Sequence, residues 1–147
     1  MAEPTSRVSP LRSAGVWSVA LGLVHIAAVG AVYPGSVRSI REAGVIGSLD
    51  AEPALAERRG VGFWYVTTGL FLIGQGAMVR EHENAHGRPP ATATPLLLLI
   101  GAWGAALTPV SGFWLFLPIA LLARRGRRSH RPSENAPGRE RNAVAGG

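Results

Sequence analysis

The sequence predicts an all-α protein: a membrane-spanning four-helix bundle with both termini on the inner side and a short helical outer loop. Hydrophobic residues make up 47% of the 147-residue chain and charged residues only 16%, whereas a soluble domain carries about 25% charged residues. The charges are also segregated, so that four apolar segments contain none. The arginines outside these segments fall mostly on one predicted side, which selects the orientation.

The first span is predicted at residues 14–32, whose 19 residues would form a helix about 28 Å long, close to the roughly 30 Å hydrocarbon core. A cleaved signal peptide is the alternative. Arg7 and Arg12 precede the segment, and Val29 and Ala31 are acceptable before a cleavage site. The length of the run and the three apolar segments after it favour a retained span.

The second span is predicted at residues 61–79 and opens with the aromatic run Phe63–Tyr65, which favours a membrane interface. The 33 residues at 91–123 carry no charge. A single straight helix of this length would be about 50 Å long, which is too long for one membrane crossing. The stretch TPVSG at Thr108–Gly112 breaks this block. We therefore expect a hairpin of two short spans at residues 91–107 and 110–123.

Arginine placement predicts the orientation, because inner segments of membrane proteins carry an excess of basic residues. With both termini inside, the inner segments hold eleven of the 15 basic residues, all of which are arginine. The outer segments hold Arg38, Arg41, Arg58 and Arg59. We therefore expect a membrane domain at residues 14–123 between an inner tail at 1–13 and a basic, disordered inner tail at 124–147.

The one long outer connection, residues 34–60, contains a capping-box pattern from Ser39 to Glu42. Its mixture of apolar residues and arginines is compatible with a short helix lying on the membrane surface. An ordinary surface turn with some helix fits the pattern equally well.

Three features together resemble a family of small, uncharacterised four-helix bacterial membrane proteins. They are a histidine within the first span, the run RRGVGFWYVTTG at residues 58–69, and PVSGFW at residues 109–114. The resemblance covers Trp17 to Leu122. It implies the four-helix membrane fold and no activity, cofactor or catalytic residue.

Composition and motifs exclude several classes of function. The chain has no cysteine, so a disulfide, a thiolate metal site and a cysteine nucleophile are absent. The predicted spans contain no carboxylate, which disfavours a proton-coupled multidrug exporter. His82 and His86 have i,i+4 spacing but no obvious third ligand, and we expect a solvated loop there, with neither metal nor haem. The basic charge follows an apolar segment, which favours lipid over nucleic acid.

His25 is the one histidine inside a predicted span, and the spans contain no Asp, Glu, Lys or Arg. Aligning the first two spans antiparallel places His25 level with Thr68, and Ser18 level with Gln75, on facing polar stripes. We expect a neutral, hydrogen-bonded His25, with a backbone carbonyl freed by Pro118 as the second possible partner. A proton or ligand site is the functional alternative.

Two function classes follow. The first is a non-enzymatic membrane protein with an accessory or interaction role, including a homodimer held by ridges of small residues such as Gly15 and Gly22. The second is binding or transport of a small apolar ligand, such as a lipid or quinone. Its candidate site residues are His25, Thr68, Gln75, Trp64, Ser111 and Trp114. In either class, we expect anionic lipid contact through Arg124, Arg125, Arg127 and Arg128.

Overall fold

The computed structural model describes residues 8–129, and this part of the chain contains helices and no strands. The α-helices are α1 (Ala14–Val32), α2 (Pro34–Glu42), α3 (Ala56–His86), α4 (Ala93–Leu107) and α5 (Phe116–Arg128). Short 3-10 turns precede three of them, at Pro10–Arg12, Pro53–Leu55 and Gly112–Leu115. The structural expectations for residues 1–7 and 130–147 lie outside the described residues.

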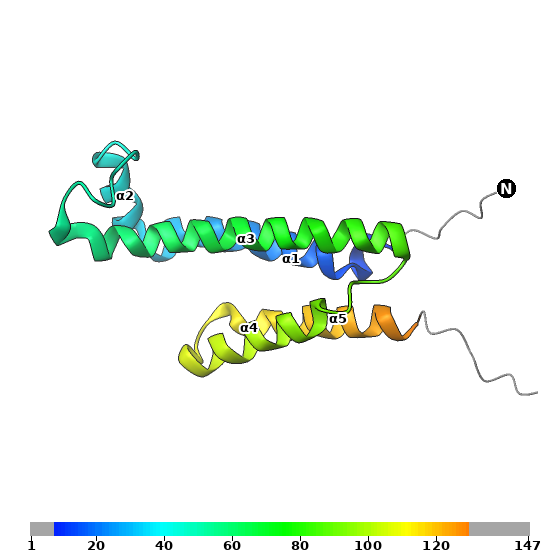
Figure 1. The fold of residues 1–147 in the computed structure, drawn as a ribbon. Coiled ribbons are helices and arrows are strands. Elements are labelled where there is room, and N and C mark those ends of the chain that lie inside the picture. The colour runs from blue at the N-terminus through cyan, green and yellow to red at the C-terminus, as the bar shows by residue number, and fades with distance from the viewer. Residues whose placement is uncertain (1–7, 130–147) are drawn as a thin grey trace, which may run out of the picture.

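The helices form two antiparallel hairpins of unequal length (Figure 1). The long helices α1 and α3 pack along each other, and the shorter pair of α4 and α5 lies beside them. The start of α1, the end of α3 and the end of α5 lie at one end, here called the terminal end. At the opposite end, here called the α2 end, α2 and the following loop pack against the start of α3.

The helix bounds follow the expected segments closely in two cases. Helix α1 coincides with residues 14–32, and α4 begins two residues after the expected start at residue 91. Helix α5 begins at Phe116 and not at residue 110, because a 3-10 turn at Gly112–Leu115 completes the connection from α4. Helix α3 has 31 residues and extends past residues 61–79 at both ends.

The C-terminal extension of α3 corrects the expected loop around His82 and His86. These residues form the last turns of the helix, which continues to His86. It stops at Gly87, whose φ of 68° places it in the left-handed region that glycine adopts without steric cost. No proline lies between Ala56 and Gly87, so the helix extends up to Gly87.

The outer connection contains a helix, which is compatible with both interpretations, but the capping box does not form. Helix α2 begins at Pro34, whose fixed φ suits the first turn. Ser39 lies in the middle of the helix, and its hydroxyl accepts a hydrogen bond from Arg59 of α3.

Glycines form the contact between α1 and α3. A Cβ atom added to Gly22 would lie 2.7 Å from the carbonyl oxygen of Gly69, and one added to Gly76 would lie 2.7 Å from the backbone nitrogen of Val19. The two backbones therefore touch directly. Gly22 is bracketed by Gly69 and Ile73, and this agrees with the antiparallel register in which residue 25 is level with residue 68.

Small residues also line the interface between α4 and α5. Ala93, Gly101 and Gly104 of α4 are buried, as are Ala120 and Ala123 of α5. Leu72, Leu97, Phe116 and Ile119 join these small residues in the core, but many other large apolar side chains of the four helices are exposed. Examples more than half exposed are Leu23, Val24, Leu70, Phe71, Met78, Leu99, Trp103 and Leu107.

One described helix, α1, is both long and apolar enough to cross a membrane. Helix α4 is also apolar but has only 15 residues. Polar residues such as Thr67, Thr68 and Gln75 interrupt the apolar part of α3, while α5 is short and ends in arginines.

Candidate functional site

His25 lies in an aromatic cluster toward the α2 end of the α1–α3 pair. Its ring stacks on Tyr65 of α3, with ring centroids 4.4 Å apart and planes 5° from parallel. Tyr33, which follows α1, meets the same Tyr65 ring edge-on at 5.1 Å. His25 and Tyr65 are each partly exposed, so the cluster forms part of the surface and not part of the core.

The expected polar partners of His25 and Ser18 do not engage them. Thr68 is exposed, and the described residues contain no hydrogen bond between it and His25. The Ser18 hydroxyl donates to the carbonyl oxygen of Ala14 in its own helix, at 2.9 Å. Gln75 is half-buried and does not contact Ser18 through a hydrogen bond. The expected backbone register is therefore present, but these polar pairs do not form.

The expected carbonyl partner created by Pro118 is also absent. Pro118 is the third residue of α5, where the first backbone N–H groups have no acceptor within the helix in any case. Proline there frees no carbonyl in the interior of the helix. The aromatic ring of Tyr65 is the partner that the structure gives to His25.

The remaining candidate residues lie in other places. Trp64 is exposed and meets Phe63 edge-on at 5.1 Å. Ser111 caps the turn between α4 and α5, where its hydroxyl donates to the carbonyl oxygen of Thr108 at 2.5 Å. The Trp114 indole donates to Pro109 in the same turn, at 2.8 Å. This turn lies beside the middle of the α1–α3 pair and not at its α2 end (Figure 1).

A buried carboxylate joins α1 and α3 at the terminal end. Glu83 is 1% exposed and accepts hydrogen bonds from the Ser13 hydroxyl and from the backbone N–H of Ala14, the latter at 3.0 Å. Ser13 in turn accepts from the backbone N–H of Val16 and caps α1. Arg80 lies 3.8 Å from Glu83. The carboxylate thus neutralises the positive end of the α1 dipole and fixes where α1 begins.

At the α2 end, a buried arginine joins separate segments, as Glu83 does at the terminal end. Arg59 is 5% exposed, and its guanidinium donates to the Ser39 hydroxyl at 2.9 Å and to the carbonyl oxygen of Ser48 at 2.8 Å. Glu52 lies 3.5 Å away on the exposed side. One side chain therefore ties α2 and the loop after it to the start of α3.

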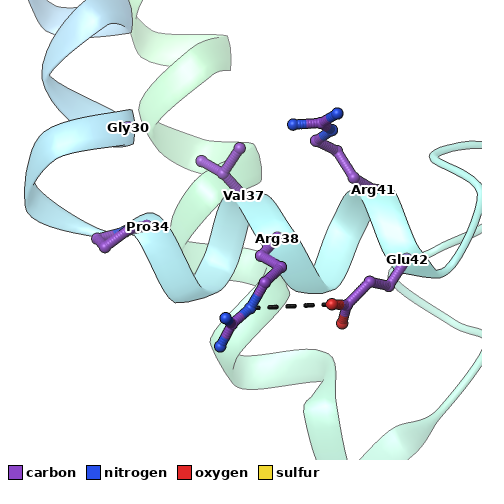
Figure 2. Close-up of a pocket in the computed structure, with 6 residues that line it drawn as sticks. All are labelled: Gly30, Pro34, Val37, Arg38, Arg41 and Glu42. Carbon is purple, nitrogen blue, oxygen red and sulfur yellow. Dashed lines mark ion pairs between the residues drawn. The ribbon is translucent and has the colours of Figure 1, made fainter.

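A shallow depression separates the end of α1 from α2, and Figure 2 shows its lining residues. Arg38 points toward Glu42 at 3.8 Å, whereas Arg41 projects from the other side of α2. Both members of the ion pair are largely exposed, so solvent screens their attraction. No catalytic arrangement is present among these side chains.

His82 and His86 form the second histidine pair, with rings stacked 4.1 Å apart. Within residues 8–129, no group of three or more histidine or carboxylate side chains is placed to hold a metal ion. The two rings lie one turn apart on one face of α3, which is helical here and not the expected loop.

A comparison with protein families matches residues 9–130 to DUF6463, a family of unknown function. The chain belongs to this family. The match covers every described helix and agrees with the uncharacterised family that the sequence motifs suggested. No curated protein and no solved structure matches the chain.

Three residues that the structure makes prominent were missed as candidates. Tyr65 lies one helical turn before Thr68, so the register that pointed to Thr68 could also have pointed to Tyr65. Glu83 was assigned to a loop, although uninterrupted helix-compatible sequence leads up to Gly87. Arg59 was counted only as an outer charge, and no pattern in the sequence gives its partners in the loop.

Proposed function

We propose that this member of the family is a small multi-pass membrane protein of the plasma membrane, with both termini inside and a non-enzymatic accessory or interaction role. The observation that carries the proposal is the distribution of side-chain size. The helices touch largely through glycine and alanine, with a small apolar core that includes Leu97 and Phe116, while many of their large apolar side chains are exposed. A large exposed apolar surface is unfavourable in water and favourable in lipid. In lipid, close packing of helix backbones also stabilises the contacts between helices.

The polar groups fit the same arrangement. Buried Glu83 and Arg59 lie at opposite ends of the α1–α3 pair and are satisfied there by neighbours from other segments. Between these two charged residues, α1 carries no charged side chain from Ala14 to Val32, and α3 carries none from Val61 to Val79. The charged ends would lie at the two membrane interfaces, with the apolar middle between them.

An interaction role follows from the unequal hairpins. The α4–α5 pair covers only part of the α1–α3 pair (Figure 1). Apolar residues of α1 and α3 such as Leu23, Leu70 and Phe71 are exposed. In a bilayer these residues meet lipid, a partner membrane protein or a second copy of the chain. Chemical crosslinking in native membranes, followed by mass determination, tests the role. Crosslinked dimers or a constant heterologous partner support it, and an uncrosslinked monomer at every crosslinker length contradicts it.

Binding of a small apolar ligand is the second candidate, favoured by the stacked pair of His25 and Tyr65. Their rings are partly exposed. A flat ring such as that of a quinone would contact the open edges of this stack. Trp64 adds an exposed ring on α3, while Ser111 and Trp114 belong to the turn between α4 and α5.

Mass spectrometry of molecules that co-purify in mild detergent tests this candidate. Replacing His25 with Leu should remove the bound ligand, whereas replacing the distant exposed His86 with Leu should leave it in place. Equal retention by both variants, or the absence of any ligand other than bulk lipid, would argue against a site at His25.

A further inference from the structure

A basic cavity of about 470 Å³ lies at the terminal end, between the linker before α4, the first turn of α4 and the last two turns of α5. Its lining includes four arginines from two separate segments. These are Arg88, Arg124, Arg127 and Arg128. Gly126 packs close to the buried Pro89, which holds the end of α5 against the linker and keeps the segments together.

None of these four arginines forms an ion pair in the part of the chain that the structure describes. The ion pairs found there belong to three other arginines, namely Arg38, Arg59 and Arg80. Four like charges around one cavity repel one another unless an anion lies between them. The cavity therefore has the electrostatics of an anion site.

The first turn of α4 adds two independent features. The helix has no side-chain cap at its N-terminus, so the partial positive charge of its dipole is uncompensated there. The Thr94 hydroxyl is buried within the same turn and has no hydrogen-bond partner in the described residues. Arginine side chains and a hydroxyl at the positive end of a helix are groups that bind phosphate.

The cavity continues into an apolar surface. Pro95 and Leu98 of α4 line it together with the arginines, and Leu99 and Leu121 are exposed further along the two helices. A ligand that fits both parts has an anionic head and an apolar tail. Free phosphate would contact only the arginine-lined part of the cavity.

We propose that this cavity is a stoichiometric site for the phosphate headgroup of an anionic phospholipid, held by Arg88, Arg124, Arg127 and Arg128 against the N-terminus of α4. The inference rests on the proposed membrane insertion and deepens it by naming the lipid partner. It also differs from general attraction between the arginine tail and the membrane. Arg88 belongs to the site, whereas Arg125, on the same helix as Arg127, does not line it.

The test compares variants that remove one charge each. The full-length protein in neutral detergent is titrated with phosphatidylglycerol or phosphatidylcholine, and bound lipids are counted by native mass spectrometry. We expect one phosphatidylglycerol to bind more tightly than phosphatidylcholine. Arg88→Gln and Arg127→Gln should each weaken this binding about fivefold, and the matched control Arg125→Gln by less than twofold.

Several outcomes would overturn the site. Equal weakening by Arg125→Gln and Arg127→Gln would show that only total charge matters, and equal affinity for the two lipids would exclude headgroup recognition. Displacement of phosphatidylglycerol by an equal concentration of inorganic phosphate would show that the apolar surface takes no part. Arg88→Gln alters the linker and not a helix, so it tests the site even if the α5 variants fail to fold. Membrane insertion is measured separately, by the labelling described below.

Discussion

Replacing Gly22 with alanine should separate α1 from α3. The added Cβ would lie 2.7 Å from the carbonyl oxygen of Gly69, about 0.7 Å closer than the 3.4 Å at which ordinary contact begins. It would also lie 3.0 Å from the backbone nitrogen of Ile73. Because these neighbours are backbone atoms, a side-chain rotation cannot relieve the clash, and the helices must move.

The expected loss in the free energy of unfolding follows from comparison with Gly30→Ala in the same helix. No atom lies within 4 Å of a Cβ added to Gly30, so this change only gains helix propensity, by up to about 1 kcal/mol. Gly22→Ala gains the same propensity and adds an overpacking cost of about 1–3 kcal/mol. The propensity contributions cancel between the two variants. We therefore expect Gly22→Ala to be about 1–3 kcal/mol less stable than Gly30→Ala.

The assay is equilibrium unfolding of the purified protein in mixed micelles as the fraction of a denaturing detergent increases, followed by helix circular dichroism. A second matched pair lies in α3, where Gly69 faces α1 and no atom lies within 4 Å of a Cβ added to Gly74. If Gly22→Ala proves as stable as Gly30→Ala, the close backbone contact between α1 and α3 is refuted.

Two other predictions concern the buried charges at the ends of the bundle. Glu83→Gln removes the carboxylate that accepts from Ser13 and Ala14 and should cost about 1–3 kcal/mol, whereas exposed Glu81→Gln should stay within about 0.5 kcal/mol in the same unfolding assay. Equal effects of the two changes would contradict a capping role for Glu83. Arg59→Gln should speed proteolytic cleavage within residues 44–50, because Ser39 and Ser48 lose their donor. Arg41→Gln on the exposed face of α2 should leave the cleavage rate unchanged, and an unchanged rate in both variants would show that Arg59 does not hold the loop.

Segment lengths and breakers in the sequence predicted most of the helical order. The uncharged run at residues 14–32 coincides with α1, and the Pro–Gly stretch at 108–112 separates α4 from α5. The antiparallel register of α1 and α3 also followed from the sequence, because two stretches with matched small and polar residues align in one way. These features depend on local sequence, which explains why they were predictable.

The side-chain partners were not predictable in the same way. Ser18 bonds to its own helix because a carbonyl four residues back is always within reach, whereas Gln75 would have to reach across the interface. His25 stacks on Tyr65 because the aromatic ring lies one turn from the expected threonine. The Arg59 partners lie 11 residues away in the irregular loop, at Ser48, and 20 residues away in α2, at Ser39, and only the folded loop brings them together.

The central claim is that the helices cross a membrane with both termini inside, and labelling of single cysteines tests it most directly. The natural chain has no cysteine, so one introduced residue reports alone. Asp50→Cys lies in the loop at the α2 end, while Asn84→Cys and Ser129→Cys lie at the terminal end. In intact cells, a membrane-impermeant maleimide should label position 50 and leave positions 84 and 129 unlabelled until the cells are permeabilised. Labelling of all three positions in spheroplasts, or of positions 84 and 129 in place of 50, would contradict the account.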